Sequence, residues 1–141
     1  MTDADRRALR VSVMQHEGLR LKPYHDTVGK ITIGYGRNLA DVGISKHEAA
    51  LLLDADLEQA EADCRASFDW FAALDGVRQG VLAEMSFNMG ITKLREFVRT
   101  VRAVKEGRYL AAAYHMLESR WAQQVGARAQ TLAQRMRTGV Q

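Results

Sequence analysis

Two carboxylates, Glu17 and Asp26, lie nine residues apart in a glycine-rich stretch that also contains the only proline of the chain, HEGLRLKPYHDTVGKITIGYG (residues 16–36). Two carboxyl groups held rigidly apart suit the cleavage of a glycosidic bond. One donates a proton to the leaving oxygen, and the other stays ionised to orient a water or to stabilise positive charge. Thr32 follows on a predicted strand and can converge with them. The spacing alone is weak evidence, since Asp26 can equally be an ordinary turn residue.

The elements that must position these groups are a helix end and a hairpin. Apolar residues at helical spacing predict a helix over residues 3–16 that ends at Gly18, and the proline that follows prevents its continuation. The segment KITIGYG alternates, with Ile31 and Ile33 on one face and Thr32 on the other. Residues 20–40 are therefore predicted to form a small hairpin, with Asp26 at the mouth of its turn.

The remainder of the chain is predicted to be helical. Ser45 and Glu48 form a capping box at the start of a long acidic helix over about residues 45–66. Asp75 can cap the next helix, a stripe of apolar residues predicts a single helix over 91–104, and the segments YLAAAYHML, SRWAQQ and ARAQTLAQRM follow. The fold class is thus α+β and mostly helical. A small N-terminal hairpin lobe is joined by a long helix to a helical C-terminal lobe, where Trp121 is expected in the core.

Composition and charge restrict the class of protein. With 141 residues and 47% hydrophobic residues, the chain can bury one compact core. Its single cysteine, Cys64, allows no intramolecular disulfide and fits a reducing cytosol. Because the N-terminus is charged, we expect it not to be a signal peptide, and no apolar run is long enough to cross a membrane. The histidines and Cys64 lack metal-ligand spacing and there is no phosphate-binding glycine loop, so we expect no metal and no cofactor.

The charge is unevenly distributed along the chain. Residues 1–75 carry 9 Lys and Arg against 13 Asp and Glu, whereas residues 76–141 carry 11 against 4. A basic C-terminal half is typical of proteins that approach an anionic polymer, such as nucleic acid or cell wall. An ordinary solvated surface explains the same charge equally well.

The stretch EGLRLKPYHDTVGKITIGYG resembles the catalytic region of the phage-type (T4-type) lysozyme and endolysin family. That family has Glu-Gly at a helix end, an aspartate nine residues on, and a threonine six further on in a T-x-G-x-G strand. The resemblance continues over essentially the whole chain, in ISKHEA, FNMG (87–90), SRW (119–121) and RTG (137–139). The segment between IGYG and the long helix is shorter than in the best-known relative, which trims the hairpin region.

The resemblance implies a single lysozyme-like domain over residues 1–141. Its N-terminal lobe would span about 15–45 and its connecting helix about 45–66. Its helical C-terminal lobe would span about 67–141, with the helix 3–16 packed on that lobe.

The resemblance also implies roles for individual residues. Glu17 would be the general acid, and Asp26 with Thr32 would position the water of an inverting reaction, which places the two carboxyl groups roughly 6.5–9.5 Å apart. Arg128 would lie against the catalytic glutamate. The implied substrate contacts are Asn38, Phe87, Thr100, His115 and Arg128; Asn38 stands where the relative has an apolar residue, and His115 where it has asparagine.

The implied function is that of a muramidase that cleaves the β-1,4 bond between N-acetylmuramic acid and N-acetylglucosamine in bacterial peptidoglycan. Such an endolysin would be a monomer that stays in the host cytoplasm until a holin releases it, with no nucleic acid partner and no stable membrane insertion. Two alternatives stay open. One is a lytic transglycosylase, which forms an anhydro sugar without water and against which Asp26 and Thr32 argue. The other is a non-catalytic basic binder of cell wall or nucleic acid, for which binding would be salt-sensitive.

Overall fold

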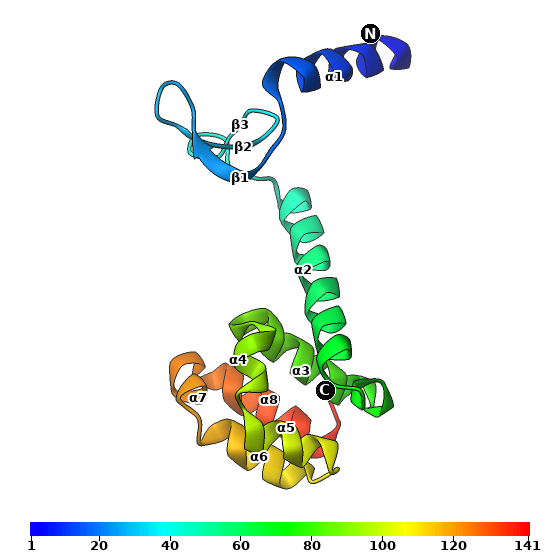
Figure 1. Cartoon of the computed structure of the whole chain (residues 1–141), viewed down its shortest axis with the longest axis vertical. Coiled ribbons are helices and arrows are strands. Elements are labelled where there is room, and N and C mark those ends of the chain that lie inside the picture. Colours follow the sequence, from blue (N-terminus) through cyan, green and yellow to red (C-terminus); the bar gives the residue numbers. More distant parts are fainter. The chain divides into compact units, whose positions relative to one another are not determined.

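The computed structural model describes all residues, 1–141, and the chain forms two compact units, residues 1–50 and residues 51–141 (Figure 1). The first unit contains α1 (Asp3–Glu17), β1 (Arg20–His25), β2 (Ile31–Gly34), β3 (Arg37–Asn38) and the start of α2 (Lys46–Ser67). The second unit contains the remainder of α2 and the elements η1 (Phe71–Ala73), α3 (Gly76–Met89), α4 (Ile91–Arg95), α5 (Val98–Lys105), α6 (Tyr109–Leu117), α7 (Arg120–Val125) and α8 (Ala127–Thr138). The predicted α+β, mostly helical class is confirmed.

Helix α1 is defined by a signal at each end. Thr2 and Asp5 form a capping box at its start, in which the Asp5 backbone N–H donates to Thr2 Oγ1 (3.2 Å) and the Thr2 backbone N–H donates to Asp5 Oδ2 (2.8 Å). At its end Gly18 takes a φ of +69°, and its N–H donates to the Met14 carbonyl. Glu17 is therefore the last residue of the helix, as the sequence predicts.

The sheet has three antiparallel strands in the order β1-β2-β3, so the predicted hairpin carries one additional short strand. Thr32 in the central strand is opposite Tyr24 on one side and Asn38 on the other. Side chains of β2 alternate as predicted, but the threonine is the buried member: Thr32 is 3% exposed, whereas Ile31 is 45% exposed. The polar face of this strand is thus the enclosed one.

The start of α2 is fixed to the sheet through its capping box. The Ser45 N–H donates to Glu48 Oε2 (2.7 Å) and the Glu48 N–H donates to Ser45 Oγ (3.1 Å), which confirms the predicted helix start. Arg37 of β3 also forms an ion pair with Glu48. The Ser45 backbone N–H and the Arg37 guanidinium together hold the pKa of Glu48 below its ordinary value. Most of α2 is exposed, and only Ala60 and Cys64 are buried along it.

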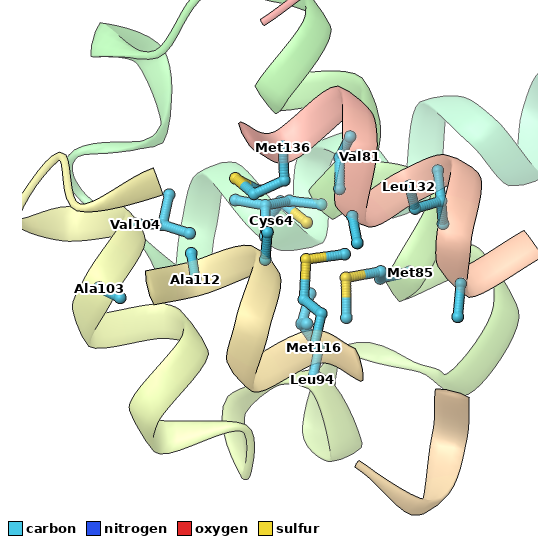
Figure 2. Close-up of a cluster of buried hydrophobic side chains, with 14 of the residues drawn as sticks. Cys64, Val81, Met85, Leu94, Ala103, Val104, Ala112, Met116, Leu132 and Met136 are labelled. Atoms are coloured by element: carbon cyan, nitrogen blue, oxygen red, sulfur yellow. The ribbon is translucent and has the colours of Figure 1, made fainter. Parts of the chain in front are cut away.

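The hydrophobic core of the second unit is formed by side chains from α2, η1 and α3 to α8 (Figure 2). Figure 2 shows side chains from helices far apart in the sequence meeting at this core, among them Met85 of α3, Met116 of α6 and Met136 of α8. Trp121 of α7 is 3% exposed, which confirms its predicted place in the core. Its Nε1 donates to Asn88 Oδ1 (2.8 Å), so the buried indole N–H is satisfied.

The prediction of one helix over residues 91–104 is wrong. The backbone N–H groups of Glu96 and Phe97 bond to the carbonyls of Lys93 and Leu94, a three-residue spacing that ends α4. Phe97 then leaves helical geometry with a ψ of 58°, and α5 begins at Val98. The break allows the Phe97 ring to meet Trp121 edge to face, with 6.3 Å between the ring centroids. None of the helices is both long enough and apolar enough to cross a membrane.

Candidate active site

Glu17 lies at the end of α1 with its carboxyl group directly over Gly36, in the turn between β2 and β3. A Cβ atom built on Gly36 would lie 2.7 Å from Glu17 Oε2 and 3.1 Å from its Cδ. Gly36 also has a φ of +78°, which side chains rarely tolerate. A side chain at this position would therefore strain the backbone and displace the Glu17 carboxyl group. Within the first unit no hydrogen-bond donor of the protein reaches the Glu17 carboxyl group, which remains available to a ligand.

Asp26 combines a structural role and a free oxygen atom. Its Oδ1 accepts hydrogen bonds from the backbone N–H groups of Val28 (3.0 Å) and Lys30 (2.8 Å), while its own N–H donates to the Lys30 carbonyl (2.9 Å). The side chain thus builds the turn between β1 and β2. Its Oδ2 has no partner in the protein. The turn role that the sequence allowed as an alternative is therefore compatible with a role in chemistry, because each uses a different oxygen.

Thr32 and Asp26 both form hydrogen bonds to Lys30. Thr32 Oγ1 donates to the Lys30 carbonyl (3.0 Å), the group that also accepts from the Asp26 N–H. Because the hydroxyl proton is already used, the oxygen of Thr32 can only accept from another molecule. Lys30 precedes β2 and Gly36 follows it, so the four-residue strand β2 separates the Asp26 anchor from the Glu17 contact. The structure therefore places all three predicted catalytic residues on one small sheet and the helix that leads into it.

Asn38 is opposite Thr32 in the sheet, but its side chain is engaged. Its Oδ1 accepts from the Asp41 backbone N–H (3.0 Å) and its Nδ2 donates to Asp41 Oδ2 (3.0 Å). Lys30 Nζ also contacts Asp41 Oδ1 (3.1 Å). A substrate contact by Asn38 stays a prediction, and it would use only the hydrogen-bonding capacity that Asp41 leaves.

In the second unit, two of the predicted contact residues line one pocket. Thr100 of α5 and His115 of α6 lie in the wall of a pocket of about 460 Å³. Its lining residues are Lys93, Glu96, Phe97, Val98, Arg99, Thr100, His115, Glu118, Ser119, Arg120 and Trp121. Phe97 and Trp121 supply apolar surface, and several cationic side chains surround it. Such a mixture of apolar wall and convergent polar groups is typical of a small-molecule site.

The other two predicted contacts lie elsewhere in the second unit. Phe87 of α3 is 41% exposed and does not line this pocket. Arg128 of α8 donates from Nε to Glu84 Oε1 of α3 (2.9 Å), and Arg135 lies 3.9 Å from the other oxygen of Glu84. The pairing of Arg128 with Glu17 stays a prediction. Glu84 was not among the predicted site residues, although a single carboxylate within the apolar run VLAEMSF indicates a specific partner.

No group of three or more His, Cys, Asp or Glu side chains is arranged to hold a metal ion.

Comparison with known proteins gives a consistent result. A family model described as phage lysozyme matches residues 14–138. The pre-baseplate central spike protein Gp5 of Enterobacteria phage T4 is 29% identical over 87% of this chain, which spans only 26% of that protein. Two probable T4-type lysozymes of Dictyostelium discoideum, 2 and 1, are 24% and 25% identical, each over 87% of this chain and 89% of the relative. The region matched by the family model contains every predicted site residue, from Glu17 to Arg128.

Proposed function

Because this chain belongs to the phage lysozyme family of glycoside hydrolases, we propose that it hydrolyses the β-1,4 bond between N-acetylmuramic acid and N-acetylglucosamine in bacterial peptidoglycan. The observation that carries the proposal is the shared anchor at Lys30, which ties Asp26 and Thr32 together at one end of β2. Glu17 lies over the turn at the other end of the same strand. The proposed proton donor and the proposed water site therefore lie near opposite ends of β2.

Glu17 is the proposed general acid. Its carboxyl group has no hydrogen-bond donor from the first unit and rests against the backbone of Gly36. Removal of water by a bound sugar favours the neutral, protonated form of a carboxyl group. A protonated Glu17 then gives its proton to the glycosidic oxygen as the bond to the anomeric carbon breaks.

Asp26 and Thr32 are the proposed water site. Asp26 Oδ2 is free, and the Thr32 hydroxyl proton is committed to the Lys30 carbonyl, so both oxygens can only accept. A water that donates one hydrogen to each of them keeps its lone pair for attack on the anomeric carbon. As the new carbon–oxygen bond forms, Asp26 takes the proton that the water loses. Water and leaving group then lie on opposite faces of the sugar, and the reaction inverts the anomeric configuration.

The second unit supplies the proposed substrate contacts Phe87, Thr100 and His115, and Asn38 adds one from the first unit. Arg128 is proposed to approach Glu17 with the nitrogens that Glu84 does not use. The basic residues 76–141 would draw the enzyme toward an anionic cell wall, an attraction that salt weakens. The biological role we propose is that of an endolysin of a phage or prophage, a monomer that reaches peptidoglycan from the host cytoplasm through a holin.

The test is clearing of purified peptidoglycan by the wild type, by Glu17→Gln and by the matched control Glu61→Gln, an exposed glutamate on α2. We expect Glu17→Gln to lose about 10²–10⁴-fold in rate and Glu61→Gln to behave as the wild type. Full activity of Glu17→Gln would remove the proposed acid. Product analysis separates the alternatives: reducing ends indicate hydrolysis, 1,6-anhydro ends indicate a transglycosylase, and salt-sensitive binding without loss of polymer indicates a non-catalytic binder.

A further inference from the structure

The pocket of the second unit contains a carboxylate with two cationic partners. Glu118 Oε1 lies 2.7 Å from His115 Nδ1 and 3.0 Å from Arg99 Nη2. All three residues line the pocket. Glu118 is also the C-cap residue of α6, directly after Leu117, and its backbone N–H donates to the Tyr114 and Met116 carbonyls of that helix. The imidazole of His115 is only 22% exposed, which limits the ways in which it can turn.

The contact with Glu118 determines which ring nitrogen of His115 carries the proton. An ionised carboxylate has no proton to donate, so a nitrogen 2.7 Å from it must be the donor. Nδ1 therefore carries a hydrogen, and in the neutral ring Nε2 keeps a free lone pair. The Arg99 guanidinium, which can only donate, contacts the same oxygen, Glu118 Oε1. Nε2 has no hydrogen-bond partner in the protein.

We propose that Glu118 is a positioning residue that fixes the Nδ1–H tautomer of His115, so that Nε2 accepts a hydrogen bond from an N-acetylated sugar in this pocket. The inference rests on the proposed function, and it adds the residue that determines whether His115 Nε2 accepts or donates in the contact with the sugar. The acetamido N–H of such a sugar is only a donor and needs an acceptor. The opposite tautomer would present N–H to N–H and reject the same group.

The surroundings of His115 suit the rest of an acetamido group. Phe97 and Trp121 offer apolar surface to its methyl group, and they are held edge to face against one another. The Ser119 hydroxyl is engaged twice within the protein, since Oγ donates to the Met116 carbonyl and accepts from the Ala122 N–H, which leaves it a single acceptor site. His115 Nε2, which has no partner in the protein, is the proposed acceptor of the ligand N–H.

The first experiment determines the tautomer directly. Long-range ¹H–¹⁵N spectra of the full-length protein at pH 8 report which nitrogen of each histidine is protonated, and His115→Asn assigns the signals of this ring. We expect a protonated Nδ1 and an unprotonated Nε2, with Nε2 shifting upfield when tri-N-acetylchitotriose is added. A proton on Nε2, or an Nε2 signal that saturating oligosaccharide leaves unchanged, would overturn the proposal. The wild-type spectra give this answer even where a variant does not fold.

The second experiment compares Glu118→Gln with Glu61→Gln, a matched loss of one negative charge at an exposed glutamate of α2 outside the pocket. An amide can donate as well as accept, so Glu118→Gln no longer dictates the tautomer. We expect KM on peptidoglycan to rise about 3- to 10-fold in Glu118→Gln with kcat within about 2-fold, the loss of roughly one hydrogen bond to substrate. Glu61→Gln should change neither value.

Equal KM values for the two glutamine variants would contradict the inference. The amide introduced by His115→Asn accepts and donates hydrogen bonds whichever residue lies beside it. In that background, Glu118→Gln should therefore have no further effect on KM. If the wild type proves inactive on peptidoglycan, the proposed function fails. The tautomer and the response of Nε2 to the oligosaccharide still decide this inference separately.

Discussion

The contact between Glu17 and Gly36 leads to a prediction that separates folding from catalysis. In Gly36→Ala the new methyl group would lie 2.7 Å from Glu17 Oε2, and ordinary contact begins at 3.4 Å. The carboxyl group must therefore retreat by about 0.7 Å. Because it is the far end of a flexible side chain, a change of rotamer achieves this at a cost of about 0.5–1.5 kcal/mol or less. The chemistry is less tolerant, since a displacement of about 1 Å can cost 10²-fold in rate.

Gly43→Ala is the matched control for Gly36→Ala. Gly43 has a φ of +64°, against +78° for Gly36, but a Cβ built on it meets nothing within 4 Å. Both alanine variants carry the strain of a positive φ, about 1–2 kcal/mol. Their urea unfolding free energies should consequently fall by similar amounts. Peptidoglycan clearing should fall about 10- to 100-fold in Gly36→Ala only.

The comparison can refute the reasoning in two ways. Gly36→Ala with the activity of Gly43→Ala would show that the position of the Glu17 carboxyl group over this turn has no catalytic importance. A much larger loss of stability in Gly36→Ala would show that Glu17 cannot move aside, and the lost activity would then report on folding. Both measurements are made on the same preparations at one temperature.

Three further variants test other parts of the structure. Asp26→Asn keeps an acceptor for the turn but loses the free carboxylate oxygen. We expect the free energy of urea unfolding to change by less than about 1 kcal/mol and the rate to fall about 10²–10⁴-fold. A rate loss that is matched by a large loss of stability would contradict the separate roles of the two Asp26 oxygens. Asn88→Ala leaves the buried Trp121 N–H without its acceptor and should cost about 1–3 kcal/mol in urea unfolding. Burial raises the pKa of the Cys64 thiol from 9.0 to about 11. The unfolded chain therefore loses this proton first, and stability should fall by up to about 1.4 kcal/mol per pH unit between about pH 9 and 11, a slope that Cys64→Ala should lack.

Local signals in the sequence predicted the elements that position the site. The capping box of Ser45 and Glu48 and the terminal Gly18 act through neighbouring backbone groups, so each is complete within a few residues. The alternation of β2 and the turn at Asp26 are equally local. These features sufficed to place Glu17 at a helix end and Asp26 and Thr32 on a hairpin.

Features that depend on distant contacts were not predictable in the same way. The break between α4 and α5 serves the packing of Phe97 against Trp121, which is 24 residues away in the chain. Glu84 and Arg128, 44 residues apart, likewise meet only through the packing of α3 and α8. Periodicity describes one helix at a time, and an apolar stripe such as that of residues 91–104 continues across a break that only the neighbouring helices demand.

The burial of Thr32 was harder to predict from the sequence than its position on the strand. The apolar face of β2 was the natural candidate for the enclosed side, yet Thr32 is 3% exposed and its hydroxyl is satisfied by the Lys30 carbonyl. A buried hydroxyl without a partner would be costly, so this hydrogen bond is what permits the threonine face of β2, and not the isoleucine face, to be the buried one. The same bond removes the only proton that Thr32 could donate and leaves it an acceptor for water. The requirement of the fold and the proposed requirement of the reaction are therefore met by a single interaction, and a substitution at Thr32 that keeps the strand but removes the hydroxyl, such as Thr32→Val, should affect both.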